Sequence, residues 1–299
     1  MISIIICSLN DKISIDLDLN IKNTIGVDYE IVYIYNINNK YSIFEAYNIG
    51  VKKARYSICC FMHDDIIYHS LNWGSFVIDS FDKDDGLGAV AIAGCQYLRK
   101  MPSFWSIPEY NVFNLIQSDR EENRKIDYWT NDSPPKNIIA FDGMWFCVRK
   151  LMFSSIQFDE LNYQGFHFYD LDIAMQIYVS GYEIKYIPNI LIEHTSRGSL
   201  TKNWLENSFK FFNKWESSLP VSYVINETST FELLENKAII SLLKLIVKNK
   251  EFKLLMPWYL TAIKVKSGLL GLMRVVLNYN LSLIAKSIKI NVFNHNSTL

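Results

Sequence analysis

The stretch Tyr56-Ser-Ile-Cys-Cys-Phe-Met-His-Asp-Asp-Ile-Ile67 decides how the rest of the chain is interpreted. Its apolar run from Ile58 to Met62 is typical of a strand that is covered on both faces. His63, Asp64 and Asp65 follow directly, at the carboxyl end of this strand. In open α/β sheets ligands bind outside these ends, and two carboxylates with an imidazole can hold a divalent ion. A simpler alternative is that the two acids cap the following turn or helix.

The segments around this stretch predict alternating strands and helices. Strands are expected at residues 2–7, 29–35 and 88–93, and helices at 42–54 and 71–81. This order predicts a parallel sheet with right-handed crossovers. A further apolar run, 138–148, is interrupted by Asp142 and Gly143. A glycine inside a strand often marks a close backbone approach.

Residues 99–136 predict a long irregular excursion. They contain four prolines and several aromatic residues, and such a segment in a compact domain is usually a lid or an acceptor loop. The rings of Trp105 and Trp129 in this segment could stack on a ligand, or could simply pack.

Asp170 and Asp172 stand at the start of an apolar-periodic helix that Gly181 ends. Acids at a helix N-terminus are favoured by ~0.3–1 kcal/mol each, which is a sufficient structural reason for them. Residues two apart on a helix do not share a face. We therefore expect one carboxylate to cap the helix and the other to point into the cleft.

Composition is that of a globular protein with an asymmetric charge. The net charge is −1, with 49% hydrophobic and 20% charged residues. From residue 241 onward, however, nine lysines or arginines face one acid, Glu251. Five cysteines without metal-type spacing indicate buried thiols in a cytosolic protein. No signal peptide is evident, and no uncharged apolar run approaches the ~18 residues of a transmembrane helix.

Taken in order, these blocks resemble the GT-A-fold, family-2-type glycosyltransferases, which move a sugar from a nucleotide donor. The matching motifs are the first strand with Ser8, Glu45-Ala-Tyr-Asn-Ile-Gly50, Phe61-Met-His-Asp-Asp65 at the place of the Asp-x-Asp motif, Phe158-Asp-Glu160, Tyr169-Asp-Leu-Asp172, and Gly181 through Pro188 to His194. The His-Asp-Asp variant resembles a bacterial subgroup with a histidine in the first acid position. Each motif alone is weak, but six in the correct order are strong.

The resemblance covers roughly residues 2–200 and implies the fold. That fold is an α/β GT-A domain, a Rossmann-like, mixed but mostly parallel sheet flanked by helices. A nucleotide-sugar half would occupy about 1–98 and an acceptor half about 99–200. A helical C-terminal region would follow at 201–299, basic and amphipathic from about 236.

The resemblance also implies roles for individual residues. Asp170 matches the catalytic base, and Asp65 matches the metal-binding acid of the Asp-x-Asp motif. His63 either binds the ion or a phosphate, or hydrogen-bonds a backbone carbonyl; His194 would reach the metal or the diphosphate. The donor-binding residues would be Ser8, Asn36, Asn48, Asp64, Asp142 and Gly143. Asn36 stands where the family usually has an acid that binds the nucleobase, so the identity of the nucleobase is left open.

The implied activity is metal-assisted, inverting sugar transfer with Mn²⁺ or Mg²⁺. The donor would be a nucleotide-sugar, and the acceptor a surface glycan or a lipid-linked glycan, such as lipopolysaccharide or capsule. The alternative is a degenerate member that binds a nucleotide-sugar or glycan without turnover. A nucleotidyltransferase fits less well, because Ser8-Leu9-Asn10 offers no Gly-rich, basic loop after the first strand.

The C-terminal region predicts an association with anionic membrane surfaces. Ser241, Lys244 and Lys248 form a polar stripe against an apolar face, and Lys264, Ser267, Gly271, Arg274 and Asn278 form another. Helices of this kind suit a membrane interface, or pack on the domain with their lysines in solvent. We expect a cytoplasmic protein, peripheral on the inner face of the membrane. The segment is too apolar for a nucleic-acid-binding arm.

Overall fold

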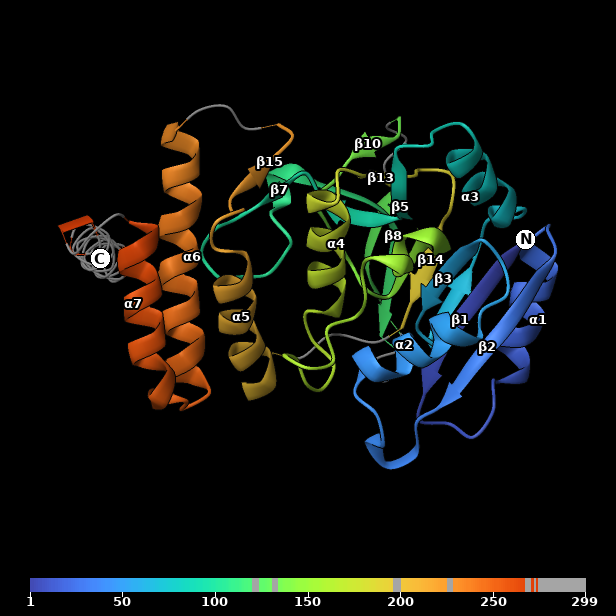
Figure 1. Ribbon diagram of the computed structural model, residues 1–299, viewed down its shortest axis with the longest axis horizontal. Helices are drawn as coiled ribbons and strands as arrows, with labels where there is room; N and C mark the ends of the chain where they lie inside the picture. The colour runs from blue at the N-terminus through green and yellow to red at the C-terminus, as the bar shows by residue number, and fades with distance from the viewer. Residues whose placement is uncertain are drawn as a thin grey trace, which may run out of the picture. The chain divides into compact units, whose positions relative to one another are not determined.

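The apolar run after Ser57 forms strand β3 (Ile58–Met62), inside a large mixed sheet (Figure 1). The computed structural model describes residues 1–119, 124–130, 134–195, 200–224, 228–266, 270–271 and 273. Within these residues the sheet has seven strands in the order β10-β13-β5-β12-β3-β1-β2. The strands are β1 (Ile2–Ser8), β2 (Tyr29–Tyr35), β5 (Leu87–Ala91), β10 (Lys136–Asn137), β12 (Trp145–Arg149) and β13 (Glu183–Tyr186), with β3.

The pairing of these strands confirms a mixed, mostly parallel sheet. β1 is parallel to both β2 and β3, and β13 is parallel to β5. β12 lies antiparallel between β3 and β5, and β10 is antiparallel to β13. β1, β2, β3, β5 and β13 therefore share one direction, and their carboxyl ends lie at one edge of the sheet.

Helices cover both faces of this sheet, as the burial of β1 shows. Ile2, Ile4 and Ile6 belong to one core cluster with residues of α1 (Ile15–Thr24) and α3 (Trp73–Asp82). Ile5 points to the opposite face, where α2 (Ile43–Lys53) crosses at Gly50. A Cβ at Gly50 would lie 2.3 Å from Ile5 Cγ2, so this close crossing requires glycine. α2 begins at a capping box of Ser42 and Glu45, which fixes its first turn.

A second sheet stands beside the first and carries part of the site. In the described residues its order is β11-β6-β8-β14-β4, with β9 paired to β8. The strands are β4 (Ile66–Tyr68), β6 (Ala93–Cys95), β8 (Asn111–Asp119), β9 (Arg124–Thr130), β11 (Ala140–Phe141) and β14 (Ile192–His194). A short pair adds β7 (Tyr97–Leu98) and β15 (Val221–Ser222). The antiparallel pairing of β14 with β4 sets His194 opposite Ile66, beside Asp65.

The prediction of an irregular excursion at residues 99–136 is wrong for β8 and β9. These two strands pair antiparallel within the second sheet. β8 alternates between buried and half-buried residues, but two of its buried positions, Asn114 and Ser118, are polar. The usual apolar alternation of a strand is therefore absent. Asn114 is satisfied there because its Nδ2 donates to the Pro188 carbonyl at 2.6 Å.

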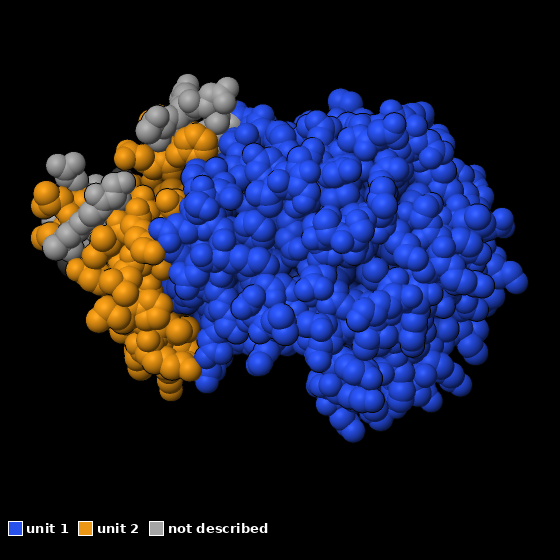
Figure 2. All heavy atoms as spheres, in the orientation of Figure 1, with its two compact units in different colours: residues 1–98, 104–226 blue, residues 99–103, 227–299 orange. Residues whose placement is uncertain are grey.

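The chain divides into two compact units, coloured separately in Figure 2. Unit 1 comprises residues 1–98 and 104–226, and unit 2 comprises 99–103 and 227–299. Unit 1 includes α4 (Tyr169–Val179), α5 (Lys202–Trp215) and β15.

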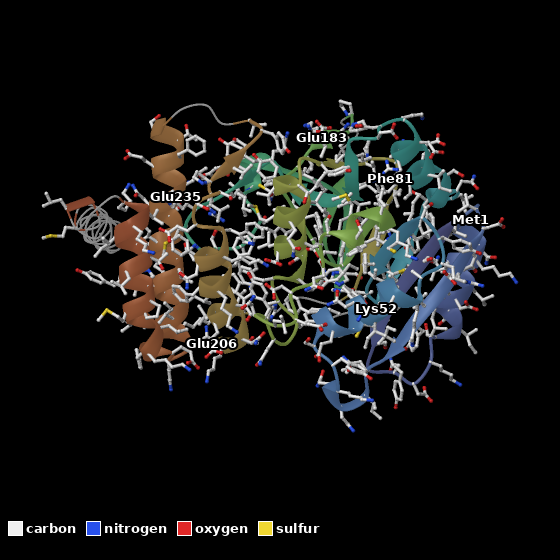
Figure 3. All side chains as sticks on the ribbon, viewed as in Figure 1. Met1, Lys52, Phe81, Glu183, Glu206 and Glu235 are labelled. Atoms are coloured by element: carbon white, nitrogen blue, oxygen red, sulfur yellow. The ribbon has the colours of Figure 1, made fainter. Side chains whose placement is uncertain are left out.

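Unit 2 is built on α6 (Thr228–Lys248) and α7 (Leu255–Val265). Glu235 of α6, labelled in Figure 3, accepts the backbone N–H groups of Lys100 and Met101, both at 2.7 Å. Trp258 of α7 donates its indole N–H to the Ile239 carbonyl at 2.9 Å, which joins the two helices. None of the helices described is long and apolar enough to span a membrane. Ser267, Arg274 and Asn278 of the second predicted stripe lie outside the described residues.

Candidate active site

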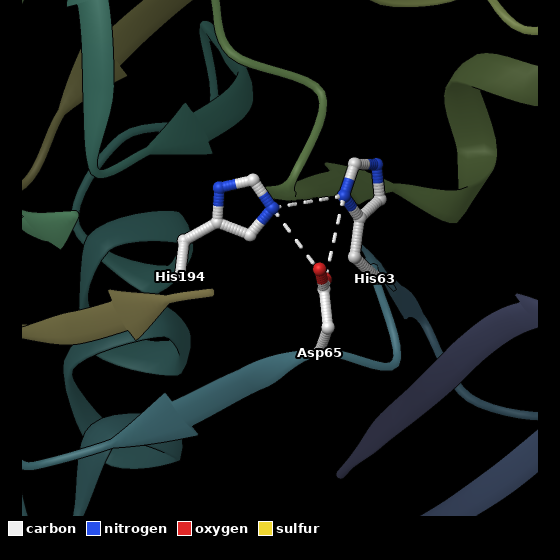
Figure 4. Close-up of side chains that lie close together, drawn as sticks. All are labelled: His63, Asp65 and His194. Carbon is white, nitrogen blue, oxygen red and sulfur yellow. Dashed lines mark hydrogen bonds and ion pairs between the residues drawn. The ribbon is translucent and has the colours of Figure 1, made fainter. Parts of the chain in front are cut away.

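Three side chains converge at the carboxyl end of β3: His63, Asp65 and His194 (Figure 4). Asp65 Oδ1 lies 3.5 Å from His194 Nε2 and 3.8 Å from His63 Nδ1. The two imidazole nitrogens lie 3.4 Å apart. One potential ligand atom from each residue thus falls within 4.8 Å of the others, an arrangement that could hold a metal ion. The three residues predicted as metal ligands from the sequence are brought together.

The surroundings of His63 and His194 shift their pKa values in opposite directions, and those of His63 suit metal binding. Burial lowers the pKa of His63, and the neighbouring His194 lowers it further. His63 is therefore neutral near pH 7, as a metal ligand must be. Its Nε2 lies 2.9 Å from the Tyr169 hydroxyl, which fixes the ring with Nδ1 toward Asp65. For His194, burial lowers the pKa, but the hydrogen bond with Asp65 and the negative charges of Asp65 and Asp142 together raise it above its ordinary value.

Asp170 occupies the first turn of α4, next in the chain to Tyr169, whose hydroxyl contacts His63. Its Oδ2 accepts the Gly143 N–H at 3.1 Å, and its Oδ1 accepts the Leu171 N–H at 2.9 Å. Burial and the neighbouring Asp142 raise the pKa of Asp170 to about 7. A carboxylate with a pKa near neutrality is suited to accept a proton at physiological pH.

Gly143 shows the close approach that its place in an apolar run predicts. A Cβ there would lie 2.2 Å from the Tyr169 hydroxyl, the group that also contacts His63. Only glycine therefore lets α4 come near enough to set Asp170 against the Gly143 N–H. Asp142 Oδ1 accepts the Met144 N–H at 2.9 Å, which shapes the turn between β11 and β12.

Ser8 and Asp64 connect two strand ends. The Ser8 hydroxyl donates to Asp64 Oδ2, and Asn10 Nδ2 donates to the same oxygen at 3.2 Å. The loop after β1 is thereby fastened to the loop after β3. Both residues stand at the same sheet edge as His63 and Asp65, consistent with their predicted place at the donor site.

Asn36 and Asn48 have different surroundings from those expected of ligand-binding amides. Asn36 is buried, and its amide pairs with the backbone of Tyr41 through Nδ2 to the carbonyl at 2.9 Å and through Oδ1 to the N–H at 2.8 Å. Asn48 holds the Phe158 backbone in the same two-bond manner, at 2.8 and 3.1 Å. Both amides therefore shape loops of the site, and their ligand roles stay predictions.

Asp172 points away from this site, into a buried cluster that the sequence reasoning missed. Asp172, which is 1% exposed, accepts the Trp215 indole N–H at 2.8 Å and lies 2.9 Å from Lys214 Nζ. Lys214 Nζ also lies 2.7 Å from Asp159 Oδ2. We call Asp159, Asp172, Lys214 and Trp215 the α5 anchor, because the last two residues end α5.

The anchor accounts for the spacing of the two acids on α4. Asp170 accepts N–H groups at the helix start and faces the site, whereas Asp172 is turned into the domain and fastened to α5. The expected division of roles is wrong for Asp172, which neither caps the helix nor points into the cleft, because its carboxylate is held by Lys214 and Trp215. A signal in the sequence was the apolar stripe of residues 202–215 ending in Lys-Trp, which marks a helix with a buried face.

Of the two tryptophans proposed to stack on a sugar, Trp105 packs. It lies against the core cluster and 6.0 Å from the Phe113 ring. The side chain of Trp129 lies outside the described residues.

The fold and the site together define an α/β protein with a metal-type cluster at the strand ends of a mostly parallel sheet. A family model described as glycosyltransferase-like family matches residues 3–215, more than two thirds of the chain. The chain therefore belongs to the glycosyltransferase-like family.

Two solved structures resemble this fold. A crystal structure of GalNAc-T7 with UDP, GalNAc and Mn²⁺ aligns with a TM-score of 0.52 at 11% identity, over 72% of this chain and 49% of that chain. This chain thus spans about half the length of that relative, and the likeness concerns the fold. The crystal structure of A197 from STIV aligns at 11% identity with a TM-score of 0.39, over 66% of this chain and 86% of that one. No curated protein sequence matches the chain.

Proposed function

We propose that the chain is a metal-dependent, inverting glycosyltransferase that uses a nucleotide-sugar. The observation that carries this proposal is the meeting of His63, Asp65 and His194 beside a carboxylate, Asp170, whose pKa is raised to about 7. Membership of the glycosyltransferase-like family supports it. The solved structure of GalNAc-T7, which shares the fold, holds UDP and Mn²⁺.

In this proposal the cluster His63, Asp65 and His194 holds a divalent ion, whose positive charge would neutralise the leaving nucleoside diphosphate. Two imidazole nitrogens and one carboxylate oxygen form a mixed donor set, which suits Mn²⁺ better than Mg²⁺, an ion that prefers oxygen ligands. Ser8 and Asp64 would contact the nucleoside side of the donor.

Asp170 is the general base of the proposed reaction. The acceptor hydroxyl attacks the anomeric carbon, the bond from that carbon to the diphosphate oxygen breaks, and Asp170 takes the hydroxyl proton. This transfer needs the hydroxyl oxygen within about 2.6–3.2 Å of the carboxylate. The N–H groups of Gly143 and Leu171 hold the carboxylate in place, and Tyr169 ties the same helix end to His63.

A thermal-shift panel tests this function directly. Sugar conjugates of UDP, GDP, CMP and dTDP are added with and without Mn²⁺ to the wild type, to Asp65→Ala and to the surface control Asp79→Ala. We expect one nucleotide to stabilise the wild type and the control in a metal-dependent way, by several degrees at 100 times its dissociation constant. Asp65→Ala should lose the metal dependence.

Three other outcomes carry distinct meanings. No shift with any nucleotide, in a folded wild type, would overturn the proposal. An unchanged metal dependence in Asp65→Ala would move the metal away from His63, Asp65 and His194. Stabilisation without any release of nucleotide from the donor would identify a protein that binds nucleotide-sugars without turnover.

We further propose that the acceptor is a surface glycan or a lipid-linked glycan, of the lipopolysaccharide or capsule kind, reached at the cytoplasmic face of the membrane. An exposed apolar row on unit 2 supports this: Phe252, Met256 and Leu260 are 57%, 63% and 53% exposed. Lys253 and Lys264 are exposed at the ends of the same row. An apolar row with flanking lysines is suited to anionic lipid, at about 1 kcal/mol per basic residue near the surface.

Liposome flotation tests this location with the full chain. We expect the wild type to float with vesicles that contain anionic phosphatidylserine, and the double variant Met256→Ser, Leu260→Ser to float much less. Leu161→Ser is the matched control, because Leu161 is exposed in unit 1. Equal flotation of all three proteins would reject the membrane surface.

A further inference from the structure

Phe166 lies against the candidate active site and remains half exposed. Its ring centroid is 5.4 Å from that of His63 and 5.7 Å from that of Tyr169, while 49% of the residue is exposed. A single exposed apolar side chain needs no explanation by itself. The loop that presents this ring, however, is fixed from several sides.

Buried hydrogen bonds pin the loop on either side of Phe166. Asn207 of α5 is fully buried, and its Nδ2 donates to the Gln164 carbonyl at 2.9 Å and to the His167 carbonyl at 3.0 Å. The Gly165 carbonyl accepts the N–H of Ile43, the first residue of α2, at 3.0 Å. Two helices far apart in the chain therefore hold one short loop in place.

The backbone of the loop is also strained. Phe168 has a φ of +74°, a left-handed conformation that is rare and unfavourable for a bulky residue. Gly165 has a φ of +76°, and a Cβ there would lie 2.6 Å from Asn203 Oδ1. Strain that is held in place by surrounding contacts gathers at ligand sites. Here it orders a loop whose exposed aromatic ring lies beside His63.

We propose that Phe166 is a platform on which the apolar face of a sugar ring stacks next to the reacting bond. The inference rests on the proposed function and names a specificity residue for it. Phe166 contacts His63, a proposed metal-binding residue, and Tyr169, the neighbour of Asp170 in the chain. A sugar on this ring is thereby next to both the leaving diphosphate and the base. The stacked sugar is either that of the donor or that of the acceptor.

Phe166→Leu and Phe166→Tyr separate stacking from packing. Leucine keeps apolar bulk without a ring, and tyrosine keeps the ring. Phe76→Leu is the matched control, because Phe76 is an exposed phenylalanine on α3, outside the site. Equal unfolding temperatures of the four proteins show that the loop is intact, so that binding differences report on the ring.

Two titrations with Mn²⁺ identify the source of the sugar. In the first, dissociation constants are measured for UDP, GDP, CMP and dTDP and for their sugar conjugates. If the donor sugar stacks, Phe166→Leu weakens the conjugate by about three- to tenfold and leaves the bare nucleotide unchanged. In the second, methyl glycosides are added as acceptor surrogates during donor cleavage. If the acceptor sugar stacks, methyl glycosides stimulate donor cleavage about three- to tenfold less in Phe166→Leu than in the wild type. The dissociation constants of the donor then stay the same.

Phe166→Tyr should behave as the wild type in whichever titration responds. Wild-type behaviour of Phe166→Leu in both titrations would overturn the platform and leave the proposed function standing. A wild type that binds no nucleotide would remove the proposed function instead. Direct binding of methyl glycosides then decides the platform: binding that is absent, or equal in wild type and Phe166→Leu, rejects it.

Discussion

Two groups of carboxylates in unit 1 have different surroundings. At the site, Asp65 lies among imidazoles and Asp170 accepts backbone N–H groups, and the pKa of Asp170 is raised to about 7 by burial and by Asp142. In the α5 anchor, Asp159 and Asp172 share the ammonium of Lys214. Burial raises the pKa of Asp159, but hydrogen bonds from Lys214 and Asn162 bring this pKa below its ordinary value.

The difference separates a working group from a structural one. In the anchor the ammonium of Lys214 balances the carboxylates, so no added cation is needed and the group can be buried within the domain. The site concentrates negative charge and offers metal-type ligands, an arrangement that a divalent ion would stabilise. Asp170 and Asp172 show this division within one helical turn. Substitutions in the two groups should therefore have different consequences, for turnover at the site and for stability in the anchor.

The largest expected effect is that of Asp170→Asn on sugar transfer. An amide cannot accept the hydroxyl proton, so we expect the turnover rate to fall by about a thousandfold. Donor affinity should change by no more than a few-fold, because Asp170 acts on the acceptor. Initial rates of nucleotide release and a titration of the donor check both quantities.

Asp79→Asn on α3 is the control for this substitution, because Asp79 is a surface acid outside the site. Its rate should equal that of the wild type. Retained turnover in Asp170→Asn would reject Asp170 as the base and would remove the distinction between the two acids of α4.

The second effect concerns stability, and it belongs to the anchor. Lys214→Met leaves the buried carboxylate of Asp172 without its cation, and breaking a buried pair costs about 3–5 kcal/mol. The lower figure, about 3 kcal/mol, is expected because the Lys214 side chain is 28% exposed. Urea unfolding measures the loss.

Lys210→Met supplies the matched control for the anchor, since Lys210 is an exposed lysine on the same helix. It should unfold within about 0.5 kcal/mol of the wild type. Equal losses for the two lysine variants would show that the anchor does not stabilise the domain.

The sequence predicts local elements better than distant partners. β3 begins and ends at the predicted residues, and α2 and α4 follow their apolar periodicity. The meeting of His63, Asp65 and His194 was anticipated from the family resemblance, although His194 ends a strand of the second sheet. Its distances depend on the pairing of β14 with β4, which no local pattern specifies.

Side chains that serve the fold through long-range hydrogen bonds escaped the sequence analysis. Lys214 and Asp172 are 42 residues apart, and their contact depends on how α5 packs against α4. Asn48 reaches 110 residues along the chain to Phe158. A polar side chain has the same appearance in a sequence whether it binds a ligand or a backbone. The structure distinguishes these uses by the partners of its donor and acceptor atoms.

The smallest expected effect is the pH dependence of stability that Asp170 contributes. The unfolded carboxyl loses its proton near its ordinary pKa of about 3.9, whereas the native one keeps it until about pH 7. Between these values the native state binds more protons than the unfolded state, so stability falls as the pH rises. We expect wild type to lose about 1–2 kcal/mol relative to Asp170→Asn between pH 4 and 8, after allowance for the solvent contact of the carboxyl. Urea unfolding in EDTA measures the difference.

A difference between the two proteins that stays constant with pH would show that Asp170 ionises as an ordinary surface acid does. It would then lack the raised pKa that distinguishes it from Asp159 of the anchor, whose pKa is lowered.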